Sequence, residues 1–63
     1  MMIRKGMKME KVLAVREDMK KVSEEEWNGV LFEAYEGEAE DGSILCVDVE
    51  DGVVIEVVKA MYV

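Results

Sequence analysis

Four residue types are missing from this 63-residue chain: histidine, proline, threonine and glutamine. The lack of histidine, with a single cysteine at Cys46, excludes a zinc cluster and a disulfide within the chain. It also leaves Ser23, Ser43 and Cys46 without the usual general base, so nucleophilic catalysis has no candidate site. We therefore expect a protein that is not an enzyme and that has no cofactor and no metal site.

Long hydrophobic runs are also missing. The apolar stretches 12–15 and 53–55 are far shorter than the roughly 20 residues that a membrane span needs. The basic start of the chain is not followed by the apolar core of a signal peptide, because Glu10 and Lys11 interrupt it. A lone cysteine is typical of a reducing compartment. We expect a cytoplasmic protein with no membrane partner.

The length of the chain predicts one small domain over residues 1–63. A domain this small buries only about 60% of the surface that its unfolded chain exposes. Since a disulfide and a zinc site are excluded, self-association is the expected additional source of stability. Residues 1–6 are a candidate flexible extension, because Met7 and Met9 are alternative starts. Abundant Glu and Lys with scarce amides follow the trend of hyperthermophile proteins.

Charge divides the chain into a basic and an acidic part. Residues 1–22 carry a net charge of +4, and residues 23–63 carry −11, within a total of −7. An acidic body disfavours phosphate, so binding of nucleic acid by the whole domain is not expected. Basic residues at the start (Arg4, Lys5, Lys8, Lys11) leave nucleic-acid contact as a minor hypothesis. We expect them to face carboxylates of the same chain or of a neighbouring copy.

Residues 7–22 have apolar side chains at helical spacing. The stripe consists of Met9, Val12, Val15, Met19 and Val22, which predicts a helix with one buried face. An alternative remains open, because Val-Leu-Ala-Val at 12–15 would be apolar on both faces of a strand. In that alternative, residues 8–16 form the first strand of a small all-β barrel.

The segment 23–39 carries two competing signals. Ser23 and Glu26 match the spacing of a capping box at the start of a helix. Asn28-Gly29 is a strong turn signal, and glycine inside a helix costs about 1 kcal/mol relative to alanine. Phe32 has no place on the helical stripe, whereas a strand can use both faces. We therefore predict a loop or single turn up to Gly29 and a strand over 30–39.

Glu-Asp-Gly occurs twice, at 40–42 and 50–52, each time before a run of aliphatic residues. Three-residue hairpin turns with a left-handed glycine would pair Tyr35 with Val47 and Val47 with Ile55. This predicts a three-stranded antiparallel meander over 30–39, 43–49 and 53–62. Its apolar face comprises Tyr35, Leu45, Val47, Val49, Val53, Ile55 and Val57. The fold class is therefore α+β, with an N-terminal helix packed on a C-terminal meander.

The opposite face of the meander is also apolar, which a half-exposed antiparallel strand does not require. An uncovered apolar face predicts a partner chain, either a second copy in a homodimer or higher homo-oligomer, or a different protein. Aromatic residues are favoured at the centres of such interfaces. The candidate interface residues are Trp27, Phe32, Val54, Val58, Ala60 and Tyr62. The expected function is a self-associating protein–protein interaction module.

The alternative function is an acidic domain that binds a small ligand or a divalent cation at the 36–51 turn region. Glu38, Glu40 and Asp41 are the candidate oxygen donors. An EF-hand loop is excluded, because its first and third positions would be Gly37 and Ala39, which have no side-chain oxygen.

Overall fold

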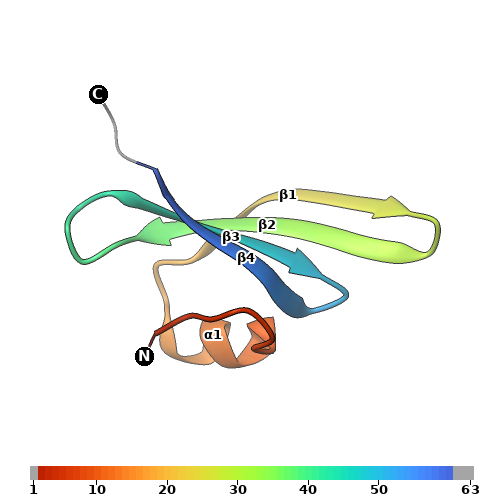
Figure 1. Cartoon of the computed structure of the whole chain (residues 1–63), viewed down its shortest axis with the longest axis horizontal. Coiled ribbons are helices and arrows are strands. Elements are labelled where there is room, and N and C mark those ends of the chain that lie inside the picture. The colour runs from red at the N-terminus through yellow and green to blue at the C-terminus, as the bar shows by residue number, and fades with distance from the viewer. Residues whose placement is uncertain (1, 61–63) are drawn as a thin grey trace.

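The computed structural model describes residues 2–60, and within them the chain forms one helix and one four-stranded antiparallel sheet (Figure 1). The elements are α1 (Met9–Val15), β1 (Lys20–Trp27), β2 (Val30–Glu38), β3 (Ile44–Glu50) and β4 (Val53–Ala60). Each strand pairs with the next along the chain, in the order β1-β2-β3-β4. The α+β class is confirmed. The sheet has one more strand than predicted.

The predicted helix over 7–22 is wrong beyond Val15. Met9 and Val12 are buried as the helical stripe requires, but Val15 and Val22 are exposed. The chain turns after α1, and the segment from Lys20 onward pairs with β2. The alternative barrel is not observed either, because its proposed first strand, 8–16, contains α1.

The extra strand follows from the turn at Asn28-Gly29. Asn28 has a φ of 51° and Gly29 a φ of 77°, the left-handed pair of a two-residue hairpin turn, and Trp27 pairs directly with Val30. Such a turn matches the twist of the strands that it joins. Pairing with β2 therefore overrides the helix preference of the Glu- and Lys-rich segment Lys20–Trp27.

The two Glu-Asp-Gly turns differ. At 40–42 the predicted turn is confirmed: Gly42 has a φ of 84°, and the Ala39 N–H donates to the Ser43 carbonyl at 2.9 Å. Tyr35 pairs with Val47, as predicted. At the second copy the turn has two residues, Asp51-Gly52, because Glu50 pairs with Val53.

A β-bulge in β4 compensates for the shorter turn. Val49 pairs with Val54 and Asp48 with Glu56, which leaves Ile55 as the extra residue. After the bulge, Val57 faces Val47, so the apolar alternation of β3 and β4 is restored. The three-residue turn would have paired Val49 with Val53 and Val47 with Ile55, and both pairs are wrong. The partner of Val49 lies one residue further along β4, at Val54, and the partner of Val47 lies two residues further along, at Val57.

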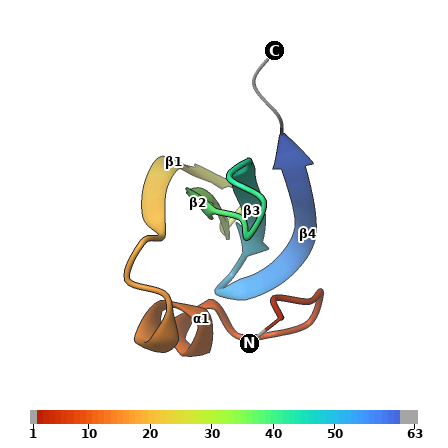
Figure 2. The same ribbon diagram turned by 90° about the vertical axis from the view of Figure 1, so that its left-hand side faces the viewer.

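The core lies between one face of the sheet and an N-terminal layer, which we define as residues 2–15. Both views show α1 and the chain before it on the same side of the sheet (Figures 1 and 2). The buried apolar residues are Ile3, Met9, Val12, Met19, Tyr35, Ala39, Leu45, Val47, Val49 and Val54. We call this side of the sheet the inner face and the opposite side the outer face.

The N-terminal layer is also hydrogen-bonded to the edge of β4. The Val54 N–H donates to the Met7 carbonyl at 2.8 Å, and the Gly6 N–H donates to the Val54 carbonyl at 2.8 Å. The Met9 N–H donates to the Gly52 carbonyl at 2.7 Å. Together with the burial of Ile3, these bonds place residues 3–6, predicted as part of an extension, against the sheet.

Candidate interaction surface

The outer face carries apolar side chains that the N-terminal layer does not reach. Trp27, Phe32 and Val58 are 67%, 36% and 46% exposed, and Val53 and Ile55 are exposed to similar degrees. Half-buried apolar residues fill the space among them. The outer-face apolar residues are Trp27, Val30, Phe32, Ala34, Ile44, Cys46, Val53, Ile55, Val58 and Ala60. An exposed apolar surface that spans all four strands is typical of a binding surface.

A shallow groove of about 240 Å³ runs across this face. Phe32 and Ala34 of β2 and the bulge residue Ile55 of β4 provide its apolar lining. Glu25 and Asp48 also line it, from β1 and β3. The groove therefore offers an apolar surface flanked by carboxylates, which suits a partner with apolar and cationic side chains.

Carboxylates surround the apolar residues over the rest of the outer face. The strand register places six acidic residues there among the described residues: Glu25, Glu36, Glu38, Asp48, Glu50 and Glu56. The same register places Lys20 opposite Glu36, as the one basic residue of this face in the described chain. The outer face is thus both apolar and strongly negative.

Most of the predicted interface residues lie on this face. Trp27, Phe32, Val58 and Ala60 share it and are exposed. Val54 does not: it is 1% exposed and packs in the core opposite Val49, because the two-residue turn moves it to the inner face. Tyr62 lies outside the described residues.

Sequence reasoning missed Val53 and Ile55 as surface residues. It assigned both to the buried face on the assumption of a three-residue turn at 50–52. A two-residue Asp51-Gly52 loop, as the sequence would also allow, places Asp48 opposite Ile55, so Asp48 and Ile55 would share one face. The β-bulge at Ile55 keeps the inner face apolar although the turn has only two residues. No sequence pattern predicts this bulge, since it depends on the packing of Val47 against Val57.

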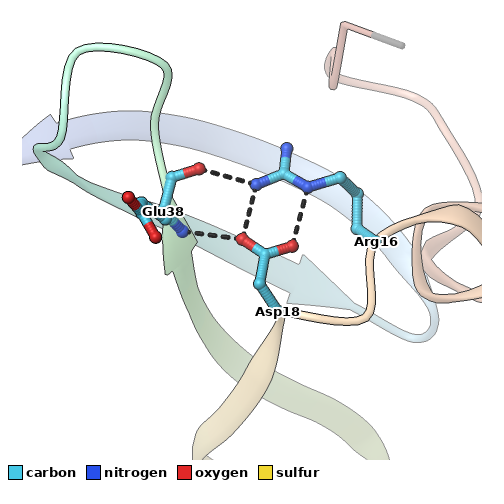
Figure 3. A network of polar contacts seen from close by, with 3 residues as sticks. All are labelled: Arg16, Asp18 and Glu38. Atoms are coloured by element: carbon cyan, nitrogen blue, oxygen red, sulfur yellow. Dashed lines mark hydrogen bonds and ion pairs between the residues drawn. The ribbon is translucent and has the colours of Figure 1, made fainter.

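Three polar clusters are the other candidates for chemistry. In the first, Arg16 and Asp18 join the α1–β1 connection to the end of β2 (Figure 3). Arg16 Nε and Nη2 donate to the two oxygens of Asp18 at 2.8 Å, and Nη2 also donates to the Glu38 carbonyl at 2.8 Å. The Glu38 N–H donates to Asp18 Oδ2 at 2.8 Å. The hydrogen bonds from Arg16 and from this N–H hold the pKa of the Asp18 carboxyl well below its usual range.

This first cluster is closed on itself, and Gly37 makes room for it. A Cβ at Gly37 would collide with Met19 Sδ and would lie 2.9 Å from Asp18 Oδ2. The missing side chain therefore lets the α1–β1 connection lie directly on β2. Arg16 Nε and Nη2, both Asp18 carboxylate oxygens and the Glu38 backbone are engaged in holding the connection, which is a structural role.

The second cluster lies on the inner face of the β1–β2 hairpin. Lys21 Nζ is 2.6 Å from Glu24 Oε1 and 3.0 Å from Glu33 Oε2, and the Tyr35 hydroxyl donates to Glu33 Oε2 at 3.3 Å. Burial and the nearby Glu33 carboxylate raise the pKa of the Tyr35 hydroxyl. These groups satisfy one another and cover the edge of the core next to Tyr35.

The third cluster lies at the 40–42 turn, where the alternative function would place a cation. Asp41 Oδ1 accepts hydrogen bonds from the Ser43 N–H and hydroxyl, which lower the pKa of the Asp41 carboxyl. Lys59 Nζ lies 4.0 Å from Asp41 Oδ2. Among residues 2–60, no three Cys, Asp or Glu side chains gather in a way that could hold a metal ion.

Comparison with protein-family models, curated proteins and solved structures finds no match for this chain. The one helix in the described range, α1, is too short to cross a membrane. The outer face is the most distinctive feature of the described surface.

Proposed function

We propose that this protein is a non-enzymatic protein–protein interaction module that self-associates through the outer face of its sheet. The observation that carries the proposal is the exposed apolar surface formed by all four strands on the side opposite the N-terminal layer. A cytoplasmic location belongs to the proposal, since Cys46 has no second cysteine with which to pair.

Burial of this surface would be favourable. Each square ångström of apolar surface removed from water contributes about 25 cal/mol, and sheets commonly pack face to face or under a helical layer. The helix α1 already packs on the inner face, where Met9 and Val12 belong to the core. A second polypeptide is therefore the available cover for the outer face.

The residues of the surface are suited to binding. Trp27 and Phe32 are aromatic, and such side chains contribute disproportionately to the energy of protein interfaces. They lie on neighbouring strands, with Glu25 opposite Phe32. Apolar anchors with a charged surround resemble the usual arrangement of an interface, in which polar residues surround an apolar centre.

The test is the mass in solution, measured by light scattering over a wide range of protein concentration. Wild-type protein should form a dimer or larger species, and Val58→Asp should lower the apparent affinity by about tenfold or more, since it would bury an unpaired charge. Val22→Asp is the matched control for the added charge, because Val22 is exposed at the bulge of the edge strand β1 and does not line the outer-face groove. A wild-type monomer at every concentration would refute the proposed function.

A further inference from the structure

We infer that the outer face of one copy binds the N-terminal layer of the next, so that self-association is head-to-tail. This inference rests on the proposed function and specifies which surface of the second copy is used. It combines two observations: an acidic apolar surface on one side of the sheet, and a basic apolar surface on the other.

The N-terminal layer is basic and partly apolar where it faces away from the sheet. Its exposed residues are Met2, Arg4, Lys5, Lys8, Lys11, Leu13 and Val15, together with Glu10 and Ala14. Lys11 and Val15 are four residues apart in α1, so they lie along one flank of the helix, and Lys8 is the residue directly before its start. This flank presents cations beside an apolar side chain, which complements carboxylates beside apolar side chains.

Among the described residues, the charged groups of the two surfaces form no ion pairs. Within residues 2–60, the ion pairs use Arg16, Lys21 and Lys59 as cations, and none uses a cation of the N-terminal layer. None of these pairs uses an outer-face carboxylate as its anion. The expectation that the early basic residues face carboxylates of the same chain is thus not met among the described residues, which leaves those of a neighbouring copy.

Charge also argues against packing two outer faces together. In a symmetric contact the same patch is used twice, so the outer-face carboxylates of one copy would lie against those of the other. Like charges brought together at an interface oppose association. In a head-to-tail contact, opposite charges meet instead.

The position of the two surfaces has a further consequence. The N-terminal layer and the outer face lie on opposite sides of the sheet, so one copy can use both at once (Figures 1 and 2). A head-to-tail contact builds a ring when its rotation closes and a filament when it does not. The mass should therefore grow beyond a dimer as protein concentration rises, and it should fall at high salt, which screens exposed charges.

Charge reversal tests the inference directly. Lys5→Glu with Lys11→Glu reverses two exposed charges of the N-terminal layer, and Glu36→Lys with Glu56→Lys reverses two on the outer face. Each double variant alone should associate at least about tenfold more weakly than wild type, because like charges then meet. A one-to-one mixture of the two variants should associate again, and so should the chain that carries all four substitutions.

Single variants control for net charge. Lys11→Glu and Lys59→Glu change the net charge equally, but Lys59 belongs to neither surface, as it pairs with Leu45 on the inner side. Only Lys11→Glu should weaken association. Circular dichroism and an amide spectrum of each variant would establish that the fold is kept, and a variant that unfolds is replaced by its single substitutions.

The outcomes separate the two proposals. If wild type associates but the N-terminal double variant associates equally well, the head-to-tail contact is wrong while the proposed function stands. The same conclusion follows if the outer-face double variant associates more tightly, or if the fourfold variant stays folded and monomeric. If wild type is a monomer throughout, the proposed function fails and the inference fails with it.

Discussion

The two faces of the sheet are built by the same strands and have different environments. In β3, Leu45, Val47 and Val49 are buried under the N-terminal layer, whereas the alternate residues Cys46 and Asp48 are half-buried on the outer face. Valine content does not separate the faces, since Val47, Val49, Val54 and Val57 lie on the inner face and Val53 and Val58 on the outer face. The faces differ in what lies over them. The N-terminal layer covers the inner face, whereas the outer face carries carboxylates and is open to solvent.

The difference in cover separates the residues that stabilise the fold from those that are available for contact with another molecule. Core residues contact neighbours on every side, so their loss leaves a cavity that the structure fills only in part. Outer-face residues have solvent on one side, so their truncation costs the isolated chain little. The same substitution should therefore act on folding at one face and on assembly at the other.

The largest effect is expected from Val47→Ala. Val47 is fully buried in β3 between Tyr35 and Val57, and removal of its two methyl groups should lower the free energy of unfolding by about 2 kcal/mol. Val58→Ala, on the outer face, should change it by no more than about 0.5 kcal/mol. Urea denaturation at low protein concentration measures both, since association would add stability at high concentration.

Equal losses for Val47→Ala and Val58→Ala at low concentration would contradict the comparison of the two faces. Such a result would mean that the outer face is covered within a single chain.

The next effect concerns how closely the N-terminal part approaches the sheet. Gly37→Ala should lower the free energy of unfolding by about 1–3 kcal/mol, because the added methyl group would overlap Met19 and approach Asp18. Thermal or urea denaturation measures this loss.

A double-mutant cycle with Met19→Ala makes the prediction specific. Met19→Ala removes the sulfur that the new methyl group would strike, so the double variant should be more stable than the sum of the single losses predicts. Strict additivity would show that Gly37 is not needed for this contact.

A smaller effect is expected at the junction of Arg16, Asp18 and Glu38. The pKa of Asp18 is lowered in the folded protein, chiefly by its hydrogen bond to Arg16. A lowered carboxyl pKa stabilises the fold at every pH above the unfolded value of about 4, and that stability is lost progressively as the pH falls below it. Asp18→Asn should therefore unfold more easily at neutral pH and lose less stability on acidification.

The measurement is the urea midpoint of wild type and Asp18→Asn between neutral pH and strong acid. Asp48→Asn is the matched control, because Asp48 lies on the outer face and takes part in no ion pair among the described residues. Parallel curves for wild type and Asp18→Asn would show that the junction does not contribute.

The sequence predicted the parts of the fold that local signals determine. The strands from Val30 onward and the turn at 40–42 match the structure, because alternation and a left-handed glycine fix them locally. The helix was right where Met9 and Val12 reach the core and wrong after Val15, where the chain leaves the helix. Of the remaining stripe residues, Met19 is buried from outside the helix, whereas Val15 and Val22 are exposed. Periodicity alone does not show which residues of a stripe have something to pack against.

The rest depended on tertiary contacts. The segment Lys20–Trp27 has the composition of a helix, and it becomes a strand because Asn28-Gly29 folds it onto β2. The bulge at Ile55 exists because Val57 must reach Val47. The sequence therefore predicted that one apolar face of the sheet would be uncovered, but it did not predict all the residues of that face correctly. Val54 was wrongly included in it, and Val53 and Ile55 were missed.

The smallest effect on folding is expected at Trp27. It ends β1, is the most exposed aromatic residue among those described, and lies beyond the part of the sheet that the N-terminal layer covers. Trp27→Ser should change the free energy of unfolding of the isolated chain by no more than about 0.5 kcal/mol. In the wild-type protein, its fluorescence should shift to shorter wavelength as concentration rises, because association removes water from the indole.

Trp27 is the chain's single tryptophan, so its emission reports on this one position. Val58→Asp should abolish the shift while leaving emission at low concentration unchanged, because Val58 is on the same face but on another strand. Emission that stays constant while light scattering records association would place the interface away from Trp27. The contact would then be confined to the β3–β4 end of the outer face, near Val58 and Ala60, and only the aromatic part of the proposed surface would be withdrawn.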